Sequence, residues 1–70
     1  MIKTLKDKMV GKRCTVELTS TDDGYQVRGY YGDCFNYNFE CFNTYEEAET
    51  FYNSLNTVRK CKQFYTEVIQ

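Results

Sequence analysis

The sequence predicts a single small α+β domain spanning residues 1–70, in which a three-stranded antiparallel meander carries one helix packed on one face. Two observations predict this fold. Apolar and polar residues alternate in three segments between residues 13 and 42, which is the pattern of strands buried on one side. After residue 44 the apolar residues recur every three or four positions instead, which indicates an amphipathic helix.

The meander is predicted from the segments 13–19, 25–31 and 35–42, which the turn residues of "STDDG" and "GDC" separate. Directly opposed residues of an antiparallel pair share a face, so we choose registers that bring apolar residues together. These registers pair Thr19 with Gly24 and Tyr31 with Phe35. They place the following residues on the apolar face: Cys14, Val16, Leu18, Tyr25, Val27, Gly29, Tyr31, Phe35, Tyr37, Phe39 and Cys41.

The helix is predicted to begin after Thr44, in the segment "TYEEAETFYNSL". Thr44 and Glu47 have the spacing of a capping box, in which the hydroxyl accepts from the Glu47 amide and the carboxylate reaches back. Acidic residues in the first turn also interact favourably with the helix dipole. The stripe that we expect to cover the sheet consists of Ala48, Phe51, Tyr52 and Leu55.

The two ends of the chain have weaker patterns. Ile2, Leu5 and Met9 fit one helical stripe, so we expect a short N-terminal helix that stops at Gly11. The tail segment "FYTEVI" is aromatic and β-branched, so we predict a C-terminal strand near 63–69. A helix is the alternative for this tail, because its apolar residues also have helical spacing: Cys61, Phe64, Tyr65, Val68 and Ile69.

Composition argues against an enzyme, because the chain contains no His and few other groups from which to build a catalytic set. We therefore expect no catalytic residue, no metal site and no cofactor. With no signal-peptide core and no membrane-spanning run in the sequence, we expect a cytoplasmic protein. Free thiols are expected in that compartment, with disulfides or a metal site as alternatives, for four residues: Cys14, Cys34, Cys41 and Cys61. Cys14 and Cys41 are expected to point into the core.

Charge is unevenly distributed along the chain, with an acidic middle between two basic ends. The predicted order of elements is similar to that of double-stranded-RNA-binding domains, which present basic residues at the start of the last helix. Here that position reads "TYEEAE", and its acids would repel a phosphate backbone. We therefore do not expect direct nucleic-acid binding to be the main function.

Protein binding is the function that these observations favour. The polar face of the meander, away from the helix, would present Arg28, Tyr30, Asn36, Asn38, Glu40 and Phe42. Protein interfaces prefer Tyr and Arg, and an acidic rim would attract a basic partner. Such a partner is expected among nucleic-acid-processing proteins. The predicted partner-binding residues are Asp22, Asp23, Arg28, Tyr30, Asp33, Asn36, Asn38, Glu40, Glu46, Glu47 and Glu49. The alternatives are a weak single-stranded nucleic-acid binder that uses the basic ends, and a homodimer formed through an open sheet edge.

The segment "FNTYEEAETFYNSL" resembles the strand-to-helix join of many small phage and bacterial proteins. The compact acidic chain as a whole is similar to phage-encoded inhibitors of host defence, the anti-CRISPR class among them. This resemblance implies a non-enzymatic inhibitor of a CRISPR-type complex in the cytosol of the host cell. It carries no site residue, because the class shares no diagnostic motif.

Overall fold

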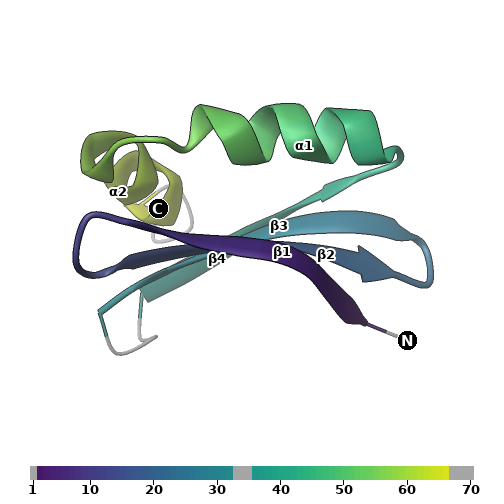
Figure 1. The fold of residues 1–70 in the computed structure, drawn as a ribbon, viewed down its shortest axis with the longest axis horizontal. Helices are drawn as coiled ribbons and strands as arrows, with labels where there is room; N and C mark the ends of the chain where they lie inside the picture. Colours follow the sequence, from purple (N-terminus) through teal and green to yellow (C-terminus); the bar gives the residue numbers. More distant parts are fainter. Residues whose placement is uncertain (1, 33–35, 67–70) are drawn as a thin grey trace.

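The computed structural model describes residues 2–32 and 36–66, with residues 36, 37, 65 and 66 described by their backbone alone. An antiparallel sheet in the order β1-β2-β3-β4 carries two helices on one of its faces (Figure 1). The elements are β1 (Lys3–Val10), β2 (Cys14–Thr21), β3 (Gly24–Tyr31), β4 (Asn36–Phe42), α1 (Tyr45–Ser54) and α2 (Val58–Thr66). The α+β architecture is confirmed, and its two terminal elements differ from the prediction.

The predicted N-terminal helix is wrong, because these residues form β1 and pair with β2. A helix of ten residues does not offset its own nucleation, whereas a strand at the sheet edge gives its backbone hydrogen-bond partners. The supposed helical stripe stays largely exposed, with Ile2 and Met9 both 61% exposed. The residues that alternate onto the helix-covered face are Lys6, Lys8 and Val10, which lie opposite Leu18, Val16 and Cys14.

The faces of β2 and β3 are as predicted, although their register differs by two residues. Thr21 pairs with Gly24 around a two-residue turn, so Leu18 lies opposite Val27 instead of Tyr25. A shift of two keeps every side chain on its own face, because strand side chains repeat with period two. Cys14, Val16, Leu18 and Val27 are accordingly fully buried.

The predicted face of β4 is wrong. Tyr31 pairs with Asn36 and not with Phe35, a shift of one residue that exchanges the two faces of the strand. Phe39 is therefore 46% exposed, and Cys41, which we expected in the core, is exposed. Phe35 and the Tyr37 side chain lie outside the described residues.

The physical reason lies at the end of β4, where the chain turns directly into α1. Phe42, expected on the polar face, faces the helices instead, and its ring centroid lies 5.4 Å from that of Phe51. An edge strand is only partly covered by the helices, so burial of its last residue outweighs the alternation earlier in the strand. The side chain of Asn38 also faces the helices and donates to the carbonyl oxygen of Phe64 at 2.9 Å.

α1 begins as predicted. The Glu47 amide donates to the Thr44 hydroxyl oxygen at 3.2 Å, and that hydroxyl donates to the Glu47 carboxylate at 3.1 Å. Ala48, Tyr52 and Leu55 are buried, and Phe51 packs against the core from its rim. The helix therefore starts from local capping and is held by the apolar stripe on the sheet.

The predicted C-terminal strand is wrong over the described residues, and the helical alternative is confirmed as α2. Thr57 initiates this helix, because its hydroxyl accepts from the Lys60 amide at 3.1 Å. Cys61 and Phe64 are buried at helical spacing, and the Phe64 ring lies 5.2 Å from the Phe51 ring. This burial and the cap outweigh the β preference of the part of "FYTEVI" that the structure describes, residues 64–66. Residues 67–70, with Val68 and Ile69, lie outside the described part.

Candidate functional site

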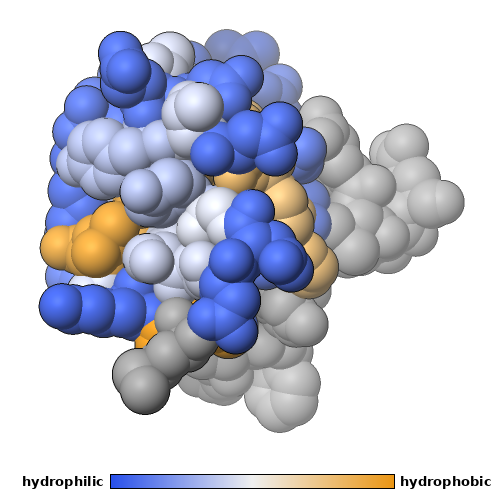
Figure 2. Space-filling model, turned by 90° about the vertical axis from the view of Figure 1, so that its right-hand side faces the viewer, coloured by the Kyte–Doolittle hydropathy of each residue, from blue (hydrophilic) through white to orange (hydrophobic). Residues whose placement is uncertain are grey.

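An open hollow of 540 Å³ lies at the end of the molecule where the β2–β3 turn meets the join between β4 and α1. Asp22 and Asp23 line it from the turn, Glu47 lines it from α1, and Ile2 and Phe42 contribute apolar surface. We call this feature the acidic hollow. Figure 2 views this end of the molecule, where hydrophilic side chains cover most of the surface between small hydrophobic areas.

Local chemistry places each acid. A two-residue turn presents Asp22 and Asp23 to solvent, and the Asp23 amide donates to the Thr21 hydroxyl at 3.3 Å. Gly24 follows with a φ of 147°, close to the Phe42 carbonyl, and this brings the turn beside the end of β4. Glu46 and Glu47 are exposed in the first turn of α1, where the helix dipole favours negative charge. The structure therefore brings together acids that lie more than 20 residues apart in the chain.

The sheet face turned away from the helices, which we call the outer face, carries Arg28 and Tyr30. The Arg28 guanidinium lies 5.9 Å from the centre of the Tyr30 ring. Arg28 lies between Glu17 on β2 and Phe39 on β4. Its Nε atom is buried and has no hydrogen-bond partner among the described residues. Phe39 belongs to this surface but was missed by the sequence analysis, because its alternation with Asn38 and Glu40 indicated the opposite face.

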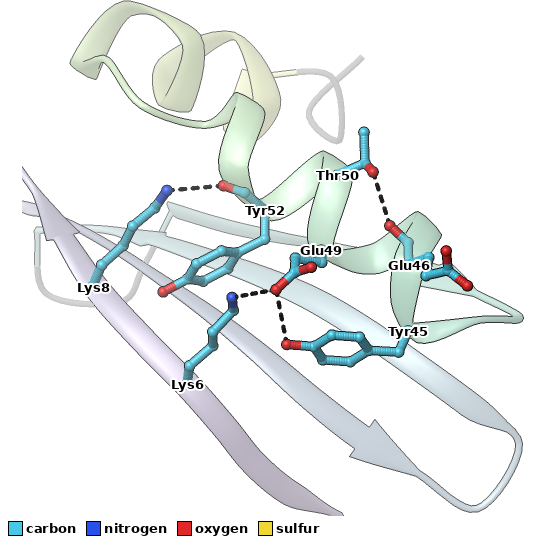
Figure 3. Close-up of polar contacts among 7 residues, drawn as sticks. All are labelled: Lys6, Lys8, Tyr45, Glu46, Glu49, Thr50 and Tyr52. Carbon is cyan, nitrogen blue, oxygen red and sulfur yellow. Dashed lines mark hydrogen bonds and ion pairs between the residues drawn. The ribbon is translucent and has the colours of Figure 1, made fainter.

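Glu49 does not contribute to the acidic hollow, because its carboxylate pairs with Lys6 of β1 (Figure 3). Lys6 Nζ lies 2.8 Å from Glu49 Oε2, and the Tyr45 hydroxyl donates to the same oxygen at 3.0 Å. These two hydrogen bonds, that of Lys6 first, lower the pKa of Glu49 below its usual value. The bond to Glu49 likewise raises the pKa of Lys6. The pair joins the edge strand to α1 and serves the fold.

Lys8 makes a second link between β1 and α1. Its Nζ donates to the carbonyl oxygen of Tyr52 at 2.9 Å and lies 4.4 Å from the centre of the Tyr52 ring. Burial lowers the pKa of Lys8. Burial also raises the pKa of the Tyr52 hydroxyl. These contacts could not be predicted from the sequence, because the spacing of Ile2, Leu5 and Met9 indicated a helix in place of β1.

Three of the predicted partner-binding residues were assigned to the outer face and do not lie there. Asn38 bonds to α2, and Glu40 lies opposite Val27 and is exposed. Asn36 lies opposite Tyr31, while its side chain is outside the described part. Asp33 lies outside the described residues as well. Of the predicted set, Asp22, Asp23 and Glu47 line the acidic hollow, and Arg28 and Tyr30 lie on the outer face. Asn38 and Glu49 link elements of the fold, while Glu46 is exposed on α1 outside the lining of the hollow.

The cysteines provide no assembled site in the described part of the chain. Cys14 and Cys61 are buried, Cys41 is exposed, and none of the three forms a disulfide. The Cys41 sulfur accepts from the Gln26 side chain at 3.6 Å. Cys34 is outside the described residues. Over residues 2–32 and 36–66, no group of three or more His, Cys, Asp or Glu side chains is arranged to hold a metal ion.

Comparison of the chain with family models, curated protein sequences and solved structures returned no significant match. Neither of the helices in the described part is long and apolar enough to cross a membrane.

Proposed function

We propose that this chain is a non-enzymatic binding module that recognises a basic segment of a partner protein through the acidic hollow. One observation carries the proposal: Asp22, Asp23 and Glu47 come from two separate elements and line one open hollow beside exposed apolar surface. Acids spread along a sequence give only a diffuse field, whereas acids around one concave site focus it. The fold therefore supplies a place where a cationic group can be held.

The chemistry of the hollow suits a Lys or Arg side chain. Such a side chain has an apolar stem and a charged end, so it can contact apolar surface and carboxylates together. Ile2, which is 61% exposed, and Phe42 offer the apolar surface, and the three acidic residues line the same hollow. Exposed charges of this kind raise the rate of encounter more than the final affinity. Binding is therefore expected to weaken as salt is added.

The partner that we propose is a nucleic-acid-processing protein, because such proteins present basic surfaces that ordinarily contact phosphates. A chain that occupies such a surface would act as an inhibitor. The narrower proposal is a phage-encoded inhibitor of a CRISPR-type complex in the host cytosol. It is supported by the resemblance of this compact acidic chain to phage-encoded inhibitors of host defence. The acidic lining of the hollow supports the broader proposal, which is a partner protein with a basic surface.

The experiment titrates a ten-residue oligolysine peptide into the ¹⁵N-labelled chain and follows amide chemical shifts by NMR. We expect saturable shifts concentrated at Asp22, Asp23, Gly24 and Glu47. The double variant D22N/D23N should weaken binding by about fivefold, because each exposed charge pair contributes up to ~1 kcal/mol. Sodium chloride should reduce the affinity of the unmodified chain.

A matched control removes the same charge elsewhere. D7N/E17Q neutralises two acids that lie opposite each other on the outer face, away from the acidic hollow. If this control weakens binding as much as D22N/D23N, only net charge matters and the proposed site is wrong. Shifts distributed evenly over the sheet would lead to the same conclusion.

A second function, binding of single-stranded nucleic acid, is favoured by the corrected position of β4. Phe39 lies on the outer face together with Tyr30, and Arg28 of β3 lies opposite Phe39 and beside the Tyr30 ring. Aromatic rings beside a cation are the groups on which bases stack. Fluorescence anisotropy with a labelled oligothymidine tests this function. Y30A and F39A should each weaken binding, and K60A/K62A should reduce its salt dependence if the basic tail takes part.

A further inference from the structure

We propose that β4 pairs with the β4 strand of a second copy of this chain across a two-fold axis, which extends the sheet through its open edge. Among the described residues, β4 has β3 on one side and no strand on the other. The backbone groups along such an edge favour pairing with another strand. The proposal concerns a surface separate from the acidic hollow.

The opposite edge of the sheet is protected against pairing. The register of β1 with β2 shifts between Thr4 and Lys6, which places an irregularity in the strand. Lys6 and Lys8 are directed towards α1, where they bond to Glu49 and to the Tyr52 carbonyl (Figure 3). A bulge and inward-pointing charges are devices by which proteins prevent edge pairing. β1 is therefore the less suitable edge.

β4 is less protected within its described residues, because it has no register shift and a single charge, Glu40, on the helix-facing side. Its register with β3 runs from Tyr25–Phe42 to Tyr31–Asn36 without a shift. The strand "NYNFECF" contains no Lys and no Pro, and its single charge is Glu40. Phe39 is 46% exposed in the middle of the strand. An exposed aromatic ring at a less protected edge is the feature that a second strand would cover.

The sequence of β4 also selects a register for two copies. If the axis passes through Phe39, the two Phe39 residues face each other and each Glu40 faces the Asn38 of the other copy. Aromatic pairs opposite each other stabilise antiparallel strands. An axis through Glu40 would instead place two carboxylates opposite each other, which is destabilising. The single charge therefore favours the register centred on Phe39.

One donor near this axis is covered from within the chain. The Phe39 amide donates to the Asn38 side-chain oxygen at 2.6 Å. Exchange of this bond for one to the carbonyl of a second copy is nearly neutral in free energy, because one hydrogen bond replaces another. The Asn38 side chain therefore accepts the Phe39 amide hydrogen bond in the monomer and does not prevent a second strand from pairing.

Sedimentation velocity over a range of protein concentrations tests the proposal. We expect a monomer–dimer equilibrium for the unmodified chain. F39K places two like charges on the axis and should weaken the dimer at least about tenfold. M9K is the matched control, because Met9 is 61% exposed on β1 at the other edge, and it should leave the dimer unchanged. A chain that stays monomeric at every concentration, or that M9K and F39K affect equally, overturns the proposal.

A designed disulfide tests the register. F39C in a C34S/C41S background retains only the buried thiols of Cys14 and Cys61 besides the new one. Residues that face each other across the axis lie at a Cα separation that a disulfide can span, so mild oxidation should give a covalent dimer. M9C in the same background should not.

If E40Q strengthens the dimer about tenfold or more, the axis passes through Glu40 and the proposed register is wrong. The oligolysine titration at the acidic hollow can succeed or fail independently of all these results.

Discussion

The ammonium group of Lys8 lies 2.9 Å from the carbonyl oxygen of Tyr52, so an edge strand supplies the cation at the end of α1. α1 has two acidic residues in its first turn and no basic residue in its last turn. The dipole of the helix favours a positive charge at the C-terminal end. Lys8 provides it from another element, at the cost of partial burial that lowers its pKa.

Replacement of Lys8 by Met tests this link. K8M keeps most of the apolar stem and removes the charged hydrogen bond, so we expect a loss of about 1 kcal/mol in the free energy of unfolding. Urea denaturation followed by circular dichroism measures it. K3M is the control, because Lys3 is exposed on the same strand. Equal effects of the two substitutions would contradict a specific role for Lys8.

The bond between Lys6 and Glu49 predicts a dependence of stability on pH. The folded-state pKa of Glu49 is lowered below 4.5, so the folded chain binds this proton less readily than the unfolded chain. The contribution is therefore fully present above pH 4.5 and is lost as the pH falls through the lowered folded-state pKa. A double-mutant cycle with E49Q and K6M, measured by urea denaturation, should show coupling at pH 7 that disappears on acidification. Coupling that is unchanged by acid would contradict the assignment.

The face of β4 can be tested with two Phe residues on the same strand. Phe42 packs against Phe51, so F42A should lower the free energy of unfolding by about 3 kcal/mol. Phe39 is 46% exposed, so F39A should cost about 0.5 kcal/mol. Both are measured by urea denaturation at a concentration at which the chain is monomeric. A reversed order would restore the face predicted from the sequence.

The turn that forms the acidic hollow depends on Gly24. A Cβ at this position would lie 2.5 Å from the Phe42 carbonyl oxygen, and its φ of 147° is rare for other residues. G24A should therefore destabilise the fold by about 3 kcal/mol. Gly32 has a φ of 69° with its nearest neighbour at 3.4 Å, in the Arg13 side chain, so G32A should cost only about 1 kcal/mol. Thermal unfolding of the two variants compares them, and equal losses would indicate that backbone conformation alone matters.

The cysteines should react at different rates with a water-soluble thiol reagent. Cys41 is exposed and should be labelled rapidly in a C34S background, whereas Cys14 and Cys61 are fully buried and should react only after unfolding. Mass spectrometry of the labelled peptides separates the three sites. Rapid labelling of Cys14 would contradict the position of the core.

Sequence alone was sufficient where the signal is local or strictly alternating. Thr44 and Glu47 fix the start of α1 through bonds between neighbours in the chain. The alternation of Cys14, Val16 and Leu18 was enough to place them in the core, because a shift of two residues in register leaves the face of a strand unchanged. The acids of the hollow were identified singly from sequence, but not the shared site that they line.

Tertiary structure alone decided the secondary structure of residues 3–10 and 58–66 and which face of β4 is turned towards the helices. Short segments such as these fit two periodicities, so the choice depends on what each can bury and bond. The first segment forms a strand because its backbone pairs with β2. The second forms a helix because this places the Phe64 ring against Phe51. Phe42 sets which face of β4 is buried, because it lies where the chain turns into α1 and its ring packs against Phe51. Periodicity shows which residues of a segment share a face, and only the neighbouring elements decide which face is buried.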